Sequence, residues 1–369
     1  MLISEPVIHF YRENYLNFSE RFIYDQLHQS SKGAKLFALS KTHKSFSQPE
    51  DKVFILNINK GLLQLFRALG FMYPSAWFRS LVKCDILHIH FGFDAYYLIR
   101  VLSNFDFKLV VTFHGYDINR KESSNFWFRF YRKNISEVFE RADKIVAVSK
   151  FIEKQLLLNG CPKDKIVVSY IGIPISSQEP IEYSDKDTTI LFVGRLEPVK
   201  GCEYLIRAAA DIQRNYPSIM LKVIGNGSQR EMLEKLAEDL NCQCMFIGEL
   251  DNISVRDEMR RALVLCSPSV PLENGECEAL GMVCLESQTM GTPVVAFDVG
   301  GIPETIPPSL NSQLVKDIDY KSLGDVILSV ITDSDGYSIR VKEGKKFVDE
   351  KFDIKVCNEE RNTIYGSIL

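Results

Sequence analysis

Residues 188–201 read TTILFVGRLEPVKG. A short apolar, β-branched run ends at Gly194, a turn follows that carries Arg195 and Lys200, and an amphipathic segment begins at residue 202. An apolar strand that passes through a turn into a helix is the building unit of a parallel sheet covered by helices. The stretch therefore predicts an α/β fold.

The same alternation continues on both sides of this stretch and forms two series. The expected strands are 7–10, 35–39, 86–90, 108–112, 144–148 and 166–169 in the first series, and 189–194, 219–224, 244–247, 263–267 and 293–297 in the second. The expected helices are 20–28, 95–103, 126–141 and 150–158, then 202–215, 229–240, 255–261 and 282–290. Two such series predict two Rossmann-like domains, each with a parallel sheet covered on both faces.

The two series are separated by residues 172–187, GIPISSQEPIEYSDKD, whose prolines and acidic, polar run are typical of a linker. We therefore expect an N-terminal domain over 1–174 and a C-terminal domain over 175–350. Residues 351–369 are expected to form a helix that crosses back to the first domain. Two α/β domains of similar size predict parallel sheets that face each other across a ligand-binding cleft.

Composition is that of an ordinary globular protein, with 46% apolar and 25% charged residues, but the charge is unevenly distributed. Residues 1–175 hold 24 Lys and Arg against 16 Asp and Glu, whereas the remainder holds 20 against 32. The N-terminal half is therefore expected to face something anionic, such as a membrane surface. Nucleic acid is less expected, because the basic residues are dispersed rather than arranged as a stripe.

Nine cysteines without regular spacing are typical of a reducing compartment rather than of a disulfide framework. The N-terminus carries no signal-peptide pattern, and the sequence contains no run of 18 apolar residues. These features predict a cytoplasmic protein, with peripheral association at the cytoplasmic face of a membrane as an alternative.

The strongest group of candidate site residues lies in EALGMVCLE, residues 278–286. Glu278 and Glu286 flank Gly281, after which a helix is expected to begin near Met282 and Val283. A helix start offers free N–H groups and a positive dipole end, which suit a phosphate, whereas the flanking carboxylates suit hydroxyl groups. A nucleotide diphosphate sugar presents this sequence of groups, with sugar hydroxyls, a diphosphate and ribose hydroxyls in turn.

Arg195 and Lys200 supply positive charge at the end of a strand, where a diphosphate leaving group would develop negative charge. Gly225 in IGNG ends a further strand and permits a close approach to the backbone. Each feature alone has a plainer reading, as a turn glycine, as solvated loop charges or as an exposed helix carboxylate. Their occurrence together, each at the carboxyl end of a strand, favours one binding site.

The stretch 190–304 resembles the donor domain of the family-4 retaining glycosyltransferases of the GT-B fold. The shared features are a strand followed by GR-x4-KG, the IGxG strand end, the E-x7-E pair and the GTPVVA…GGxPE tail. The resemblance implies that Glu278 contacts the donor sugar and Glu286 the ribose hydroxyls. It also implies that a group of cationic and backbone donors holds the diphosphate, namely Arg195, Lys200, Gly194, Gly225, Gly281 and the N–H groups of Met282 and Val283.

In the N-terminal half, VTFHGYD (residues 111–117) ends a strand, and the resemblance implies that His114 contacts the donor sugar. Residues 19–23, SERFI, resemble a helix start of exopolysaccharide and colanic-acid-type members, with Arg21 where those have Thr. The glycine-rich first loop of many relatives is absent, because 11–18 are aromatic and polar. His88 and His90 share one face of a strand, but no nearby ligands complete a metal site, so we expect no metal.

Two segments, 62–83 and 119–133, mix basic with aromatic residues. Such segments are either amphipathic core helices or helices that rest on a membrane interface, where they would bring the enzyme to a lipid-linked acceptor.

The resemblance implies a retaining hexosyltransferase that moves a sugar from a UDP- or GDP-sugar to a hydroxyl of a glycan or lipid-linked oligosaccharide in bacterial surface polysaccharide synthesis. No cofactor beyond the donor substrate is expected. Three alternatives remain: a nucleotide-sugar epimerase of the same fold, a non-catalytic nucleotide-sugar-binding partner, and a glycoside hydrolase, which also uses two carboxylates but has no need for phosphate-binding cations.

Overall fold

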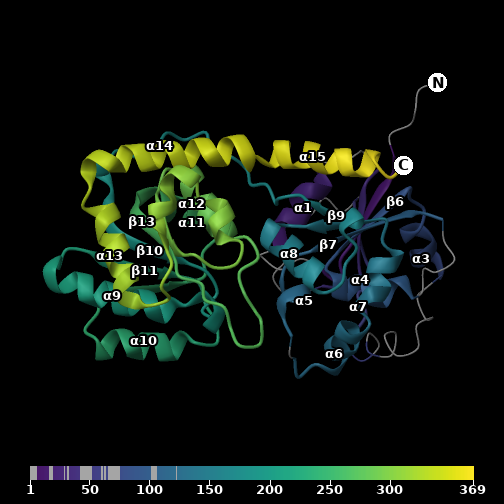
Figure 1. The fold of residues 1–369 in the computed structure, drawn as a ribbon, viewed down its shortest axis with the longest axis horizontal. Coiled ribbons are helices and arrows are strands. Elements are labelled where there is room, and N and C mark those ends of the chain that lie inside the picture. The colour runs from purple at the N-terminus through teal and green to yellow at the C-terminus, as the bar shows by residue number, and fades with distance from the viewer. Residues whose placement is uncertain are drawn as a thin grey trace. The chain divides into compact units, whose positions relative to one another are not determined.

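A computed structural model describes residues 6–15, 20–28, 30, 33–41, 52–59, 61, 64, 75–100, 106–121 and 123–369 (Figure 1). The chain divides into two compact units. Unit 1 contains residues 1–172 together with 357–369, and unit 2 contains residues 173–356. The first division falls inside the stretch 172–187 that the sequence marks as a linker.

Unit 1 is built on a seven-stranded sheet of order β5-β3-β1-β6-β7-β8-β9, whose registered pairs are all parallel. Its strands are β1 (Ile8–Tyr11), β3 (Lys35–Ala38), β5 (Val53–Ile55), β6 (Ile86–His90), β7 (Lys108–Phe113), β8 (Lys144–Ala147) and β9 (Ile166–Val168), and a two-stranded sheet pairs β2 (Asn14–Tyr15) with β4 (Ser40–Lys41). Its helices include α1 (Arg21–His28), α3 (Ser75–Leu81), α4 (Gly92–Ile99), α5 (Tyr116–Asn119), α6 (Phe126–Lys133), α7 (Ile135–Arg141) and α8 (Lys150–Leu158).

Unit 2 has a six-stranded parallel sheet of order β12-β11-β10-β13-β14-β15. Its strands are β10 (Asp187–Val193), β11 (Met220–Ile224), β12 (Cys244–Gly248), β13 (Ala262–Ser267), β14 (Val294–Phe297) and β15 (Leu314–Val315). Its helices are α9 (Cys202–Asn215), α10 (Arg230–Asp239), α11 (Asn252–Arg261), α12 (Met282–Thr289), α13 (Tyr320–Ile331) and α14 (Ser334–Lys351), after which α15 (Ile354–Gly366) leads into unit 1.

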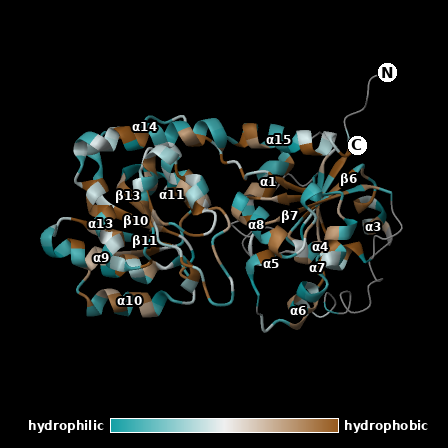
Figure 2. Cartoon of the chain, viewed as in Figure 1, coloured by the Kyte–Doolittle hydropathy of each residue, from teal (hydrophilic) through white to brown (hydrophobic). Residues whose placement is uncertain are grey.

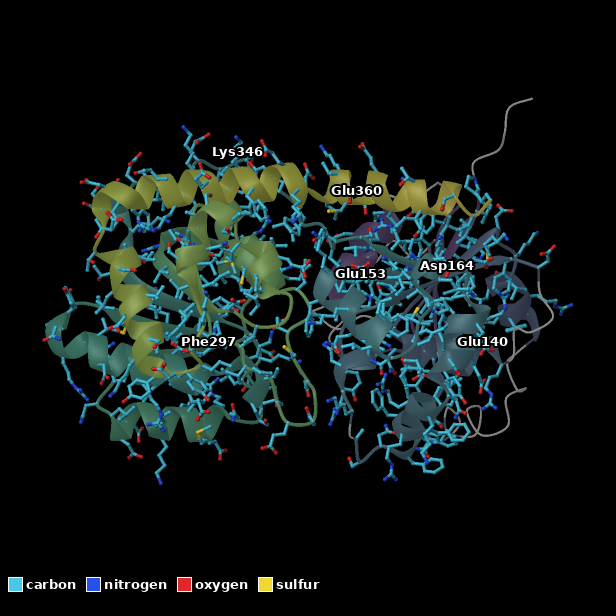
Figure 3. The ribbon with its side chains drawn as sticks, viewed as in Figure 1. Glu140, Glu153, Asp164, Phe297, Lys346 and Glu360 are labelled. Carbon is cyan, nitrogen blue, oxygen red and sulfur yellow. The ribbon has the colours of Figure 1, made fainter. Side chains whose placement is uncertain are left out.

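Hydrophobic residues gather on the strands of both sheets (Figure 2). The five residues of β6 are all buried, as are the six of β13, because these central strands have helices on both faces. Phe297 of β14 is fully buried, whereas Lys346 of α14 projects outward with 68% of its side chain exposed (Figure 3). The prediction of two Rossmann-like parallel-sheet domains is confirmed.

Each sheet has one position at which the strand order reverses, between β1 and β6 in unit 1 and between β10 and β13 in unit 2. Ligands of open α/β sheets bind beyond the carboxyl ends of the strands at such a position. The loops after these four strands begin at Arg12, Phe91, Gly194 and Pro268. They are therefore the first segments in which to look for a site.

The expected single helix over 126–141 is wrong, because α6 and α7 are separate helices that meet at Asn134. Asn134 leaves the helical region with φ −119° and ψ 23°, and its side-chain amide donates to the carbonyl of Phe130 at 2.8 Å. An asparagine side chain can satisfy the last carbonyl groups of a helix and so end it. The apolar spacing continues across the break, and the pattern alone therefore does not reveal it.

Candidate functional site

In unit 2, the loops after β10 and β13 are hydrogen-bonded to each other. Residues Pro198–Lys200 form a short 3-10 turn, and the N–H of Val270 donates to the carbonyl of Val199 at 2.9 Å. This bond ties the turn that carries Arg195 and Lys200 to the loop that leads toward Glu278. The strand reversal between β10 and β13 thus brings together two segments far apart in the sequence.

Gly225 brings the end of β11 against the same turn. Its φ is +133°, and a Cβ at this position would lie 1.9 Å from the carbonyl oxygen of Gly194. The N–H of Gly194 in turn donates to the carbonyl of Ile224 at 3.0 Å. Only glycine fits such a close approach, which accounts for the IGxG pattern as packing between two strand ends.

Glu278 and Lys200 form an ion pair whose side chains are 18% and 23% exposed. The hydroxyl of Ser269 also lies 3.4 Å from the Glu278 carboxylate. Burial raises the pKa of Glu278, but the charge and hydrogen bond of Lys200, the Ser269 hydroxyl and the charge of Arg195 together hold that pKa below its ordinary value. Glu278 is therefore an ionised carboxylate beside two cations.

The loop that carries Glu278 is held by the glycine pair Gly300-Gly301. The N–H of Gly301 donates to the carbonyl of Glu278 at 3.0 Å, and a Cβ on Gly301 would lie 2.0 Å from the carbonyl oxygen of Ala279. The glycines of the GGxPE tail thus permit the contact that positions Glu278.

Helix α12 begins directly after this loop, with Gly281 at its N-cap. Within the described residues, no side chain caps this end, so the N–H groups of half-buried Met282 and Val283 lie at the positive end of the helix without a side-chain acceptor. Glu286 lies one turn further on and is also half-buried. The interpretation of an anion-binding helix tip between two carboxylates fits this arrangement.

In unit 1, His114 follows β7, and its ring is half-buried. Its Nε2 lies 3.0 Å from Nδ1 of His90, and the ring packs against Phe22 and Phe91 at centroid distances of 5.0 and 4.5 Å. Burial, and next the positive charge of Arg12, lowers the pKa of His114 to about 3. The ring is therefore neutral at physiological pH and can donate or accept one hydrogen bond at Nδ1.

The backbone around His114 is held by Asp117, a residue to which the sequence assigned no role. Its buried carboxylate accepts from the N–H groups of Gly92, His114 and Gly115 at 2.8, 3.1 and 3.0 Å. Burial raises the pKa of Asp117 to about 6, against the effect of these N–H donors. The sequence signal was present in HGYD, since an aspartate after a turn glycine often binds backbone N–H groups.

His88 uses both of its ring nitrogens within the protein, whereas His90 uses only Nδ1, which faces His114. His88 bonds through Nδ1 to the Tyr365 hydroxyl of α15 and through Nε2 to the Thr112 hydroxyl, each at 2.6 Å. His90 stacks on His88 with ring centroids 4.6 Å apart. Within the described part of the chain, no group of three or more His, Cys, Asp or Glu side chains could hold a metal ion.

A buried ion-pair cluster after β1 was also missed from the sequence. Arg12 donates to Asp94 at 2.5 Å and to Glu20 at 2.9 Å, and its guanidinium lies 4.2 Å from the ring centroid of Phe91. Phe91 has a φ of +74°, which is rare for a residue other than glycine. Arg12 and Asp94 are 82 positions apart, and nothing in the sequence pairs them in advance.

Of the two basic aromatic segments, 119–133 is described apart from residue 122, whereas most of 62–83 lies outside the described residues. Helix α6 is amphipathic, with Phe128 and Tyr131 buried and Phe126 60% exposed. None of the described helices is both long enough and apolar enough to cross a bilayer.

Comparison with known proteins finds glycosyltransferase families in both halves of the chain. The model of the family described as glycosyl transferases group 1 matches residues 176–347, and that of glycosyltransferase family 4 matches residues 33–177. An uncharacterized glycosyltransferase of Methanocaldococcus jannaschii is 27% identical and covers 86% of each chain. The amylovoran biosynthesis glycosyltransferase AmsK of Erwinia amylovora is 26% identical over 66% of this chain and 60% of its own length.

Among solved structures, that of Anabaena HepE in complex with UDP and glucose superimposes with a TM-score of 0.79. It is 18% identical and covers 98% of this chain and 99% of its own, a likeness that bears on the fold alone. The two family models adjoin at the linker, one in each unit. The chain therefore belongs to the group 1 and family 4 glycosyltransferases of the GT-B fold.

Proposed function

We propose that this protein is a retaining hexosyltransferase that moves a sugar from a UDP- or GDP-sugar to a hydroxyl of a glycan or lipid-linked acceptor in bacterial surface polysaccharide synthesis. The observation that carries the proposal is the ionised Glu278 paired with Lys200 and close to Arg195, where the strand order of unit 2 reverses. The name of AmsK, an amylovoran biosynthesis enzyme, and the UDP and glucose bound by HepE support the substrate class.

Arg195 and Lys200 would bind the diphosphate, together with the N–H groups of Met282 and Val283 at the α12 tip. Their charges would stabilise the negative charge that develops on the diphosphate as the glycosidic bond breaks. Glu278 would accept hydrogen bonds from hydroxyls of the transferred sugar, and Glu286 from the ribose. We assign His114 a hydrogen bond to the donor sugar. In this scheme the two cations supply the charge neutralisation, and no metal ion or cofactor is required.

Retention is proposed to follow a front-face route. The bond from the anomeric carbon to the diphosphate breaks, the acceptor oxygen bonds to the same face of that carbon, and the acceptor proton passes to an oxygen of the departing diphosphate. This route needs no separate protein base. The low pKa of Glu278 agrees with that, because a carboxylate held ionised by Lys200 is a poor proton acceptor.

The rival functions fit these contacts less well. A glycoside hydrolase has no use for the two cations, Lys200 and Arg195, that lie beside Glu278. An epimerase would use the same donor site without an acceptor, and product analysis separates it from a transferase. A non-catalytic binding partner would turn over no donor.

The acceptor is proposed to lie at an anionic membrane that unit 1 contacts peripherally. Arg129 and Lys133 on α6 are exposed beside the exposed ring of Phe126. Basic and aromatic side chains on one helix surface suit the boundary between lipid headgroups and water.

A thermal-shift screen against UDP, GDP, ADP and their sugars tests the donor assignment. A ligand that binds only the folded state raises the melting temperature by mass action. We expect one base to give a clear shift in the wild type and a weaker one in Lys200→Gln. The exposed Lys235→Gln on α10 serves as a charge-matched control. Failure of every nucleotide at millimolar concentration to shift the wild type would overturn the proposal.

A further inference from the structure

The ring of His90 is the buried neighbour of His114, and the transfer chemistry proposed above gives it no role. His90 is the last residue of β6 and is fully buried, with its Nδ1 3.0 Å from Nε2 of His114. Its own Nε2 is also buried and has no hydrogen-bond partner within the described residues. In a neutral imidazole one ring nitrogen donates and the other accepts. The proton positions of the two rings are therefore linked.

Both rings are neutral at physiological pH. Burial lowers the pKa of His90 well below its ordinary value, and the positive charges around the ring add to this effect. The pKa of His114 is lowered to about 3, mainly by burial and next by the charge of Arg12. The contact between them is therefore a hydrogen bond between two neutral imidazoles, in which one ring donates and the other accepts.

The unpartnered Nε2 of His90 indicates which ring donates. If His114 donated from Nε2, the single proton of His90 would lie on its Nε2, as a buried N–H without an acceptor. If His90 donates from Nδ1, its Nε2 carries only a lone pair. An unpaired buried N–H group is the rarer and more costly of the two in folded proteins. The donor is therefore Nδ1 of His90, and the acceptor is Nε2 of His114.

This arrangement leaves the proton of His114 on Nδ1. Which nitrogen of a histidine carries the proton is set by the hydrogen bond that the other nitrogen makes. Nδ1 of His114 bonds no atom of the described residues. The ring cannot turn freely, because Phe22 and Phe91 pack against it and Asp117 holds its backbone N–H. His114 therefore presents a fixed N–H donor.

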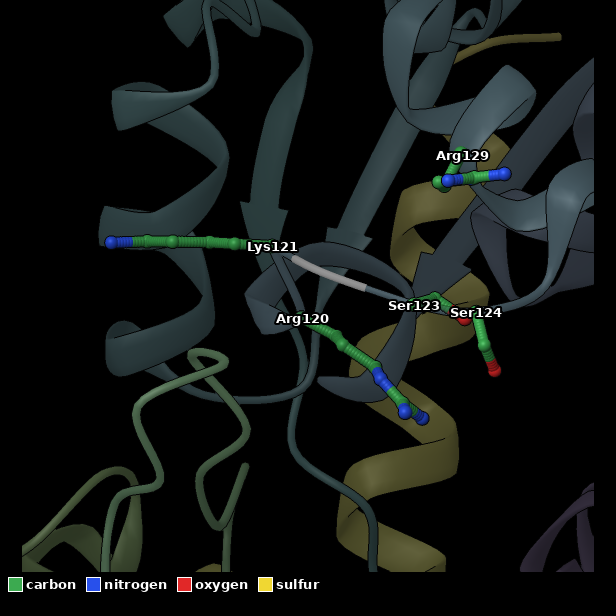
Figure 4. A pocket seen from close by; sticks show the side chains of 5 residues that line it. All are labelled: Arg120, Lys121, Ser123, Ser124 and Arg129. Atoms are coloured by element: carbon green, nitrogen blue, oxygen red, sulfur yellow. The ribbon is translucent and has the colours of Figure 1, made fainter.

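The basic surface at the far end of α5 gives no other explanation for the state of His114. The segment after α5 lines a surface pocket (Figure 4) with basic and hydroxyl side chains, those of Arg120, Lys121, Ser123, Ser124 and Arg129. Among the charges of the described residues, Arg12 is the one that lowers the pKa of His114. The proton position of His114 thus depends on its contact with His90 and not on this pocket.

We propose that His90 is a positioning residue, whose Nδ1–H donates to Nε2 of His114 and fixes the proton of His114 on Nδ1 as a donor to the substrate. The identity of the substrate group, an oxygen of the transferred sugar, rests on the proposed function, whereas the proton positions do not. An N–H donor at this place accepts any oxygen with a lone pair and rejects an ammonium group. His90 thereby restricts which donor sugars fit.

Nuclear magnetic resonance of the full-length protein with isotopically labelled histidine reads the proton positions directly. The chain has only six histidines, and the signals of His90 and His114 are assigned by their loss in H90F and H114F. In the wild type we expect the proton on Nδ1 of both rings. H90F keeps an aromatic ring but has no donor, so His114 should lose this preference. H90N places an amide donor near the position of Nδ1 and should restore it.

Kinetics with the same variants separate positioning from mere support of the core. H90F should lower kcat roughly tenfold, which corresponds to the loss of one hydrogen bond, and H90N should recover most of it. The melting-temperature shift with UDP should stay that of the wild type, because His114 is assigned to the sugar and not to the nucleotide. H28F, which changes an exposed histidine on α1, is the matched control and should leave the His114 signals and kcat unchanged.

A proton on Nε2 of His114 in the wild type, or the same proton position in the wild type and H90F, would overturn the proposal. A lower melting temperature of H90F with unaltered kcat would also overturn it, because His90 would then only fill the core. If the proton positions are as expected but no sugar is transferred from any donor, the role of His90 toward His114 holds and the proposed function is refuted.

Discussion

At the scale of single residues, the lowered pKa of Glu278 decides which chemistry is available. A buried carboxyl group without a neighbouring cation would have a raised pKa and could act as an acid. Lys200 and Arg195 instead keep Glu278 ionised. The sequence identified all three residues but could not pair them, because Lys200 and Glu278 are 78 positions apart. Their contact exists only because β10 and β13 are neighbours in the sheet.

Substitution of the two glutamates should separate sugar recognition from nucleotide binding. Glu278→Gln preserves shape but removes the charge, and we expect kcat to fall roughly 100-fold, because hydrogen bonds to a charged group are worth about 1.5–3 kcal/mol. Glu286→Gln should raise the donor KM several-fold with a smaller change in kcat. Initial rates at varied donor concentration measure both. An unchanged kcat in Glu278→Gln would remove that residue from the sugar site.

At the scale of elements, the strands around the site were predicted closely and the connections between them were not. Every strand expected in unit 2 is present, since an apolar run bounded by turns has few other solutions. The division of 126–141 into two helices depended on one side-chain hydrogen bond of Asn134, which no periodicity reports. The fit of Gly301 against Ala279 was equally hidden in the pattern.

Gly301→Ala tests whether the glycine pair holds the Glu278 loop. The added methyl group would lie 2.0 Å from a backbone carbonyl oxygen, so the loop has to move. We expect a lower melting temperature and a several-fold weaker UDP-sugar shift. Gly324→Ala on α13 is the matched control, because its nearest neighbour atom would be 3.7 Å away and alanine favours helix. Equal donor binding by Gly301→Ala and the wild type would contradict this role.

The C-terminal helix offers a second test at this scale. Tyr365→Phe removes the hydroxyl that bonds His88 at 2.6 Å and leaves a buried ring nitrogen without its partner. Such a loss costs about 1–3 kcal/mol, and the unfolding free energy of unit 1 should fall by that amount. Urea unfolding measures it, with Tyr216→Phe, which is 42% exposed, as the control. Equal midpoints would mean that α15 is held by other contacts.

At the scale of the whole molecule, the two units have separate cores, so we expect the stability of unit 1 to depend on pH and that of unit 2 on nucleotide. The pKa values of His88, His90 and His114 are all lowered by burial, so the unfolded chain binds more protons than the folded one below about pH 6.5. Stability of unit 1 is therefore lost as pH falls from about 6.5 toward 3. The pKa of Asp117 is raised to about 6, which has the opposite effect on stability, but this is one group against three histidines.

Calorimetry at pH 7.5 and pH 5 with and without UDP checks this separation. Acidification should lower the unfolding free energy of unit 1, and with it the temperature of its transition. One such histidine contributes about 2 kcal/mol to this loss at pH 5. UDP should raise the transition of unit 2, where Arg195, Lys200 and the α12 tip lie. A single transition that shifts as one with both agents would show that the two units do not unfold separately.

The alternation of strands and helices, the two-domain α/β class and the residue types of the proposed donor site could all be predicted from the sequence. These follow from local apolar periodicity and from glycines and charges at strand ends, which short stretches of chain record. The contact of Lys200 with Glu278, the support of the Glu278 loop by Gly301 and the bond of Tyr365 to His88 appear only in the folded molecule. Those contacts arise from strand order and from a helix that returns to an earlier sheet, and burial then sets the charge state of each group.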